Sequence, residues 1–401
     1  MIPEGLDDKI LLMKKIDSNK TYLLICSFYI VYYITLGVVG PYMNVYYERL
    51  GFGGSQIGLI TSLGMIASMM FTPIWGVLSD KTKNPRAVIA FILVMAGITS
   101  IIWSTQTAFM PVMILSIILS VFRQNVWSLV DGVGIQFCSD YGKDFGFARS
   151  MGSLGYLLGS FAIANLMFAL GFSGPYMQVF VVCSFAGAIM IMCVPASTHV
   201  EKAKEKVNFI DSLKELLTNR SYLFVVLMML LTSLVVDTIL NYSGNHLINA
   251  LGQSDSMIGI FSLVQVFPEI IIVMFANRIF RRMKTSQVFM MAAVAQLIRF
   301  VLCAVSSNIV VFLLATSLHG VTIAVSSVGY VSYIQKHVKR EILATAMALY
   351  GTAGTIGVAL LNQLFGFVYE YASSYQLFTI GAIAAAIAMV ILIFNKKLDE
   401  E

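Results

Sequence analysis

Ionisable side chains deep within long apolar stretches are the residues of this chain best suited to chemistry. They comprise three acids, three arginines and one histidine: Asp131, Asp237, Glu269, Arg123, Arg149, Arg299 and His319. An ionised group among apolar side chains is unfavourable unless it is paired, so each of these positions needs a reason. Carboxylates and guanidinium groups can hydrogen-bond solute hydroxyl groups, and carboxyl and imidazole groups can also exchange protons. These residues are therefore candidates for solute binding and proton exchange.

Asp131 and Arg149 flank a turn around Asp140, at nine residues on either side. Two antiparallel helices joined at that turn would bring them to similar depth, where they can pair. Tyr156 lies seven residues after Arg149, two helical turns along the same face, so its ring is expected above the guanidinium group. The three side chains could then bind a polyhydroxylated or planar solute. The alternative is a purely structural ion pair beside a packed tyrosine.

A second polar cluster is expected around Glu269, Arg299 and His319. Glu269 precedes Arg282 by thirteen residues and Arg299 follows it by seventeen, so both lie near mid-depth if two helices meet at that turn. His319 follows another turn, near Ser307, and returns to comparable depth. A solute or a conformational change could alter the protonation of Glu269 in this cluster, which would allow proton coupling. The alternative is a static salt bridge between Glu269 and Arg299 that only orders packing.

A polar stripe is predicted on the seventh apolar segment. Asp237, Asn241 and Asn245 follow one another at four-residue steps and therefore share one face of a helix. We expect this face to line an internal cavity, with Asp237 and Asn241 as solute-binding side chains.

The elements that carry these residues are predicted to be membrane-spanning helices. Hydrophobic residues make up 58% of the 401 positions and charged residues 12%, about half the charged fraction of soluble domains. Segments of about 20 residues cross the hydrocarbon core, and helices satisfy the backbone hydrogen bonds there. Twelve candidates begin near Tyr22, Gly54, Arg86, Phe109, Gly146, Pro175, Ser221, Asp255, Ser286, Ile309, Arg340 and Gln376. The predicted fold class is an all-α membrane protein with twelve transmembrane helices in two six-helix halves.

The positions of the basic residues predict the orientation of the chain. With both termini in the cytoplasm, all 26 Lys and Arg residues except Arg49, Arg123, Arg149 and Arg299 fall in cytoplasmic segments or at their edges, as the positive-inside rule requires. The net charge of +5 therefore reflects orientation in the bilayer and not nucleic-acid binding. No cleavable signal peptide is apparent. We expect a multi-pass protein of the cell (inner or plasma) membrane.

A polar stretch near the middle of the chain predicts the domain division. Residues 1–20 are expected to form a cytoplasmic tail, 21–197 the first six-helix half, 198–220 a cytoplasmic linker, 221–396 the second half and 397–401 a second tail. The stretch 209–217 within the linker is predicted to form a short amphipathic helix. All five cysteines lie in or beside apolar segments without metal-ligand spacing, so we expect free thiols and no metal site.

A loop between the second and third apolar segments carries a recognisable motif. It contains Gly76, Asp80, Lys81 and Arg86, and Asp80 can pair with nearby basic groups or cap a helix, which would stabilise one conformation. This motif resembles the corresponding loop of major facilitator superfamily transporters. The alternative is a plain positively charged loop.

Three regions together resemble the lactose permease branch of that superfamily, the oligosaccharide and proton symporters, and the related nucleoside and phenylpropionate permeases. They are residues 71–81, Asp131 with residues 145–152 and Tyr156, and the set Glu269, Arg299 and His319. The resemblance implies that Asp131 and Arg149 hold solute hydroxyl groups, that Tyr156 stacks on a ring, and that Glu269 and His319 join binding to proton coupling. The chain has Thr322 where that branch has a second glutamate, and Asp131 is shorter than the glutamate of the branch.

The function expected from these observations is proton-coupled uptake of a sugar, an oligosaccharide, a glycoside or a similar hydroxylated solute by alternating access. The partners would be the solute, protons and the bilayer, with a monomeric protein. No ATP-binding loop is present, so a proton gradient rather than a cofactor would supply the energy, and the protein is not expected to be an enzyme. Three alternatives are an exporter or antiporter of amphipathic compounds, a nucleoside or aromatic-acid permease, and a membrane sensor that transports nothing.

Overall fold

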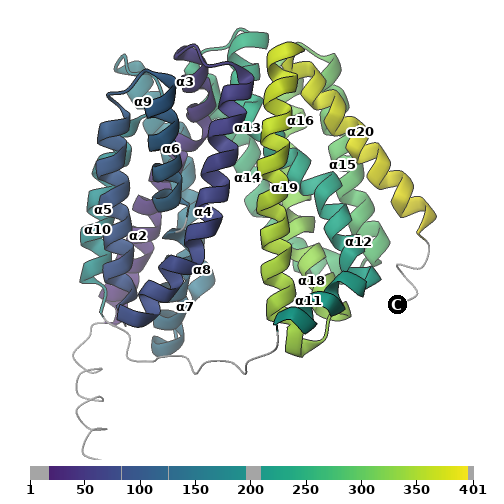
Figure 1. The fold of residues 1–401 in the computed structure, drawn as a ribbon, viewed down its shortest axis with the longest axis horizontal. Helices are drawn as coiled ribbons and strands as arrows, with labels where there is room; N and C mark the ends of the chain where they lie inside the picture. The colour runs from purple at the N-terminus through teal and green to yellow at the C-terminus, as the bar shows by residue number, and fades with distance from the viewer. Residues whose placement is uncertain (1–17, 83, 125, 196–208, 396–401) are drawn as a thin grey trace, which may run out of the picture.

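The computed structural model describes residues 18–82, 84–124, 126–195 and 209–395. Within these ranges the chain folds into two groups of helices that stand side by side (Figure 1). Eleven helical segments of the described chain are long and apolar enough to cross a membrane, and α10, an apolar helix of 17 residues, takes the sixth position. The predicted all-α membrane fold is confirmed.

The first group, which we call the N half, is coloured purple to teal in Figure 1. Its elements are α2 (Ser18–Val39), η1 (Gly40–Tyr42), α3 (Met43–Arg49), α4 (Gly54–Thr82), α5 (Pro85–Trp103), α6 (Phe109–Arg123), α7 (Val126–Tyr141), α8 (Phe145–Leu157), η2 (Leu158–Ile163), α9 (Ala164–Ala169) and α10 (Met177–Cys193). Several spans are built from consecutive helical segments, such as α2 to α3 and α6 to α7.

The second group, the C half, runs from green to yellow. Its elements are α12 (Arg220–Met229), η3 (Leu230–Leu234), α13 (Val235–Asn245), η4 (His246–Ala250), α14 (Asp255–Phe280), α15 (Thr285–Val305), α16 (Ile309–Ser317), α17 (His319–Ala324), η5 (Val325–Tyr330), α18 (Val331–His337), η6 (Arg340–Ile342), α19 (Leu343–Tyr371) and α20 (Ser374–Phe394).

A short helix, α11 (Phe209–Thr218), precedes the C half where the amphipathic helix is predicted. Lys339 Nζ lies 3.0 Å from Glu215 Oε1, and Asn219 Nδ2 donates to the carbonyl oxygen of His337 at 3.2 Å. These contacts attach α11 to the end of the C half. Residues 1–17 of the predicted first tail, the predicted second tail, and the first part of the predicted linker with its Lys202–Lys206 run lie outside the described residues, whereas residues 18–20 of the first tail begin α2.

Polar caps begin several helices at the same end of the bundle. The side chains of Asn84, Asp144 and Asn219 accept hydrogen bonds from the backbone amides that begin α5, α8 and α12, and Pro85 supplies a φ angle suited to a first helical turn. We call this end, where the described chain also begins and finishes, the termini end, and the opposite one the α3 end (Figure 1).

The apolar core is shared between the halves only at the α3 end. One buried cluster there contains residues of both halves, including Val38, Tyr42, Tyr242 and Phe365. Toward the termini end the buried residues divide into two clusters, one belonging to the N half and one to the C half. The described halves are therefore packed together at the α3 end and separate toward the other.

Hydrogen bonds between the halves follow the same distribution. The guanidinium group of Arg49 pairs with the carboxylate of Asp255, with Nη1 2.8 Å from Oδ2. Glu48 accepts from three side chains of the C half: Asn245 (2.6 Å), Asn249 (2.7 Å) and Tyr369 (3.0 Å). These contacts close the α3 end.

Glycines allow the backbones of α4 and α19 to touch beside the contacts that close the α3 end. A Cβ atom on Gly58 would lie 2.6 Å from the carbonyl oxygen of Asn362, and a Cβ on Gly366 would collide with the carbonyl oxygen of Gly54. Gly351 lies in open space farther along α19. Small residues permit close helix contact in membranes, so the closure depends on Gly58 and Gly366 having no side chain.

Replacing Gly366 by Leu should open the α3 end, because the backbone of α4 cannot move aside as a flexible side chain can. Spin labels at Thr107 and Ser254, two exposed positions at this end, should show longer distances in a background without native cysteines. The same change at Gly351 should leave the distances unaltered. Unchanged distances in the folded Gly366→Leu variant would show that the contact does not hold this end closed.

Candidate functional site

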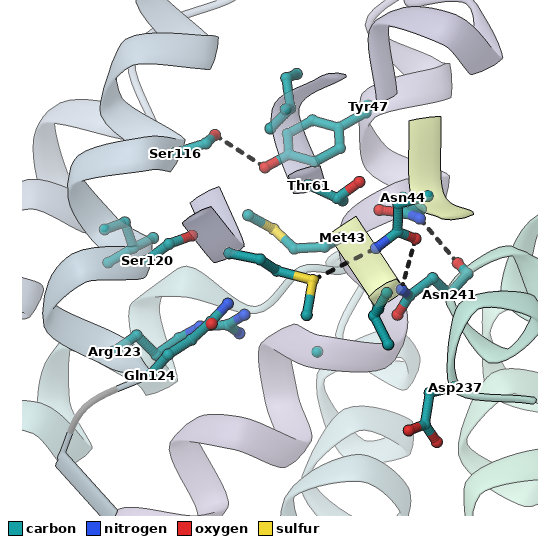
Figure 2. Close-up of a pocket in the computed structure, with 16 residues that line it drawn as sticks. Met43, Asn44, Tyr47, Thr61, Ser116, Ser120, Arg123, Gln124, Asp237 and Asn241 are labelled. Carbon is teal, nitrogen blue, oxygen red and sulfur yellow. Dashed lines mark hydrogen bonds between the residues drawn. The ribbon is translucent and has the colours of Figure 1, made fainter. Parts of the chain in front are cut away.

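A cavity of about 330 Å³ lies between the two halves (Figure 2). Its walls come from the first span and from α4 and α6 of the N half, and from α13 and α19 of the C half. The lining residues are Gly40, Met43, Asn44, Tyr47, Ile60, Thr61, Met65, Ser116, Leu119, Ser120, Arg123, Gln124, Asp237, Asn241, Val358 and Asn362. Ligand pockets span about 300–1,000 Å³, so this cavity suits one small solute.

Amide side chains join the two halves along one side of the cavity. Asn44 Nδ2 donates to the carbonyl oxygen of Asn241 at 2.9 Å, and Asn241 Nδ2 donates to Asn362 Oδ1 at 3.0 Å. Asn362 Nδ2 in turn lies 3.4 Å from the sulfur of Met65. Figure 2 shows the hydrogen bond between Asn44 and Asn241 in this network. The amides can therefore contact a solute and also contribute to the closure of the α3 end.

Two charged side chains enter the cavity from opposite halves, Arg123 from α6 and Asp237 from α13 (Figure 2). Neither has an ion-pair partner among the residues that the structure describes. The Nε atom of Arg123 is buried without a hydrogen-bond partner. Asp237 is within electrostatic range of Arg299. The cavity thus presents one guanidinium group and one carboxylate that are available to a solute.

The predicted pairing of Asp131 and Arg149 is present in the structure. Arg149 Nε lies 3.3 Å from both carboxylate oxygens of Asp131, and the Tyr29 hydroxyl donates to Asp131 Oδ1 at 2.8 Å. Both charged side chains are partly exposed, at 33% for Arg149 and 21% for Asp131. The pair lies outside the lining of the cavity, on α7 and α8.

The predicted position of Tyr156 above the Arg149 guanidinium is wrong. The ring over that group belongs to Tyr33 of α2, at 4.8 Å from the guanidinium carbon to the ring centroid. Gly152 makes this arrangement possible, because a Cβ there would lie 2.9 Å from the Tyr33 ring and 3.2 Å from Arg149 Nη1. Tyr156, which lies one turn after Gly152 on α8, is instead within electrostatic range of Glu269 and Arg123.

The predicted cluster of Glu269, Arg299 and His319 is also assembled. Arg299 Nη1 lies 3.2 Å from His319 Nδ1, and His319 Nε2 lies 3.8 Å from Glu269 Oε2. Gly320 allows α17 to approach α14 here, because a Cβ on it would lie 2.7 Å from the Cα atom of Glu269. Arg299 and His319 are buried, and Glu269 is partly exposed.

The geometry assigns the protonation of His319. An arginine can only donate hydrogen bonds, so the Nδ1 atom that faces Arg299 must carry a lone pair. The imidazole is then neutral, with its proton on Nε2, which faces Glu269. Glu269 is further within electrostatic range of Asp237, so this cluster is linked to the acid that lines the cavity.

The polar stripe on α13 divides between two roles. Asp237 and Asn241 line the cavity as predicted. Asn245 instead donates to Glu48 Oε2 at 2.6 Å and to the carbonyl oxygen of Asn44 at 3.1 Å. It therefore belongs to the contacts that close the α3 end.

The motif between α4 and α5 lies at the termini end. Gly76 is in open space, Lys81 is exposed, and the guanidinium group of Arg86 donates to the carbonyl oxygen of Val194 after α10. The side chain of Asp80 lies outside what the structure describes. The described cysteines are all free, and no cluster of metal-ligating side chains is found among the described residues.

Sequence reasoning gave Arg123 no partner and did not single out Asn362. The signal for Arg123 was its charge within an apolar segment, but no spacing to an acid distinguished it. Asn44 and Asn362 are uncharged and lie far apart in the chain, so only the packing of α3 against α13 and of α4 against α19 reveals that they line one cavity.

The chain is similar to known proteins over nearly its whole length. Residues 22–395 match the model of the MFS_1 like family. The uncharacterized transporter YwbF of Bacillus subtilis (strain 168) is 24% identical over 97% of this chain and 96% of its own, and the maltose permease of Geobacillus stearothermophilus is 22% identical over 91% and 93%. The crystal structure of a mutant of the nucleoside transporter NupG matches with a TM-score of 0.82 at 17% identity, covering 93% of this chain and 99% of that one.

Replacing His319 by Leu should destabilise the protein, because the buried guanidinium group of Arg299 loses its acceptor. An unsatisfied buried donor costs about 1–3 kcal/mol, and more when it is charged. His319→Asn should lose much less, since its Oδ1 atom can take the place of Nδ1. Thermal unfolding in detergent compares the two, and equal melting temperatures for Leu and Asn would contradict the assignment of Nδ1 as the acceptor.

Proposed function

The chain belongs to the MFS_1 like family of secondary transporters, and we propose that it takes up a sugar, oligosaccharide, glycoside or similar small hydroxylated solute together with protons. The observation that carries this proposal is the cavity between the halves, which is lined by polar side chains from both. A solute there touches both halves at once. Binding can therefore bias their relative positions, as alternating access requires.

Asp237 and Asn241 are proposed to bind the solute directly, since they line the cavity. Their carboxylate and amide groups can accept and donate the hydrogen bonds that sugar hydroxyl groups need. Asp131, Arg149 and Tyr156 of the N half and Glu269 of the C half are proposed as further solute contacts when the halves move. The maltose permease that resembles the chain across nearly its whole length supports a sugar-like solute.

In this proposal the closed α3 end is the outer side of the transporter. With both termini in the cytoplasm of a cell whose inner or plasma membrane holds the protein, the α3 end faces outside. The structure is then an inward-facing state, in which contacts such as Arg49 to Asp255 and Glu48 to Tyr369 form the outer gate. Import requires this gate to open and the termini end to close.

Glu269, His319 and Arg299 are proposed as the proton-coupling group. Glu269 faces the Nε2–H of a neutral imidazole, and His319 connects it to a buried guanidinium. Gain of a proton by Glu269 removes its attraction to both partners. Solute binding can therefore respond to the proton through Asp237, which is within electrostatic range of Arg299 and Glu269.

The loop motif between α4 and α5, the energy source and the monomeric state are part of the same proposal. Gly76, Asp80, Lys81 and Arg86 are proposed to stabilise one conformation at the termini end, where Arg86 already links α5 to the end of α10. A proton gradient supplies the energy, no cofactor is required, and a monomer is sufficient because both halves lie in one chain.

Replacing Arg149 by Ala should weaken solute binding at least about ten-fold, because a charged hydrogen bond to the solute is worth about 1.5–3 kcal/mol. The measurement is ligand-induced thermal stabilisation with a panel of mono- and disaccharides, glycosides and nucleosides. Arg278→Ala removes an equal charge from an exposed position and serves as the control. Undiminished affinity in the Arg149 variant would remove this residue from the site.

Replacing Glu269 by Gln should abolish proton-driven accumulation in proteoliposomes while exchange of solute for solute continues. The amide keeps the shape of the side chain but cannot release a proton at neutral pH. Glu215→Gln on α11, which breaks only the surface pair with Lys339, should leave both activities intact. Accumulation that still follows the pH gradient in the Glu269 variant would place the coupling elsewhere.

A further inference from the structure

Arg123 is the interior cation to which the mechanism above gives no role. Its Nε atom is buried and unpartnered, and the guanidinium group has no ion-pair partner within the described ranges of the chain. The groups within electrostatic range of it are the side chains of Tyr32, Tyr47 and Tyr156. Neutral hydroxyl groups do not balance its charge, and a cation that is partly removed from water without a counter-charge is unfavourable. Because the side chain lines the cavity, a solute can supply that counter-charge.

The opposite wall suits hydroxyl groups. Asp237 and Asn241 face the cavity from α13 (Figure 2). Asn362 lines it from α19, so this wall offers a carboxylate and two amides. At about 330 Å³ the cavity is near the lower end of the range for ligand pockets. One small molecule can therefore reach Arg123 with one end and Asp237 with the other.

We propose that the solute is a hydroxylated monocarboxylic acid, such as a sugar acid, whose carboxylate pairs with Arg123 while its hydroxyl groups bind Asp237 and the neighbouring amides. A guanidinium group pairs with a carboxylate through two parallel hydrogen bonds, which gives both affinity and orientation. This inference rests on the proposed function, because it names the class of solute that the same cavity takes.

The charges of the interior support an acid over a neutral sugar. Deep within the described spans there are three guanidinium groups, on Arg123, Arg149 and Arg299, and three carboxylates, on Asp131, Asp237 and Glu269. Asp131 balances Arg149, and His319 is neutral, so one of the two remaining acids balances Arg299. The other is the only carboxylate left for Arg123, and it lies on the opposite half.

When the acid that would balance Arg123 binds a proton, Arg123 is left without a counter-charge. The carboxylate of the solute then restores the balance. The proton goes to Asp237 or Glu269. Arg299 and Tyr350 lie within electrostatic range of Asp237, and His319 and Tyr156 lie near or within electrostatic range of Glu269. The empty carrier and the carrier loaded with one proton and one monoanion then have equal interior charge. Transport should be electroneutral, with one proton for each acid. A neutral sugar with one proton would instead leave an extra positive charge in the interior.

Matched pairs of solutes test the preference for an acid. Gluconate and sorbitol, glucuronate and glucose, and lactobionate and lactitol differ mainly in the carboxylate, and their affinities are measured by calorimetry on the purified protein. At least one acid should bind about ten-fold or more tightly than its neutral partner. Arg123→Gln should bring that ratio close to one, Arg123→Lys should retain part of it, and Arg278→Gln should not change it. No binding by any acid, or equal loss for acid and neutral partner in Arg123→Gln, overturns the inference.

Uptake into proteoliposomes tests the charge balance and separates this inference from the proposed function. Uptake of the acid should follow an imposed pH gradient and remain unchanged when valinomycin and potassium set an inside-negative potential. Acceleration of acid uptake by that potential overturns the electroneutral stoichiometry. Proton-driven uptake of neutral sugars without preference for acids overturns the inference and supports the proposed function. Tight acid binding that depends on Arg123, without proton-driven uptake, supports the inference and overturns the proposed function.

Discussion

The structure depends on keeping charged side chains balanced in an interior that neither lipid nor packed apolar groups can solvate. Asp131 and Arg149 satisfy this requirement within the N half, with the hydroxyl of Tyr29 and the ring of Tyr33 completing the surroundings. In the C half the neutral imidazole of His319 connects Arg299 to Glu269. Arg123 and Asp237, one on each half and both at the cavity, have no ion-pair partner in the part of the chain that the structure describes. The unbalanced charges thus lie where a solute and the motion of the halves can act on them.

The arrangement of apolar residues separates stability from motion. Each half has its own buried cluster near the termini end, and a third cluster joins the halves near the α3 end. A half can therefore move as a unit without losing its own core. The shared cluster and the hydrogen bonds of Glu48 and Arg49 are the contacts that must break for the α3 end to open.

Much of this organisation could be predicted from the sequence, because membrane spans obey strong local rules. Length and hydropathy predict the helices, and spacing around a turn predicts depth, which is why Asp131 meets Arg149 and why Glu269, Arg299 and His319 assemble. Depth does not determine how each helix is rotated about its axis. The ring over Arg149 therefore comes from Tyr33 on another helix, admitted by Gly152, and not from Tyr156. Likewise the cavity amides Asn44 and Asn362 come together only through the packing of one half on the other.

The shared apolar cluster at the α3 end makes the balance between the two faces of the carrier sensitive to temperature. Opening that end would expose side chains such as Tyr42, Tyr242 and Phe365 to water, and exposure of apolar surface raises the heat capacity. The state with the α3 end closed is then favoured by the hydrophobic effect, which weakens on cooling. The working temperature of the cell thereby becomes one of the quantities that determine which side of the membrane the empty carrier faces.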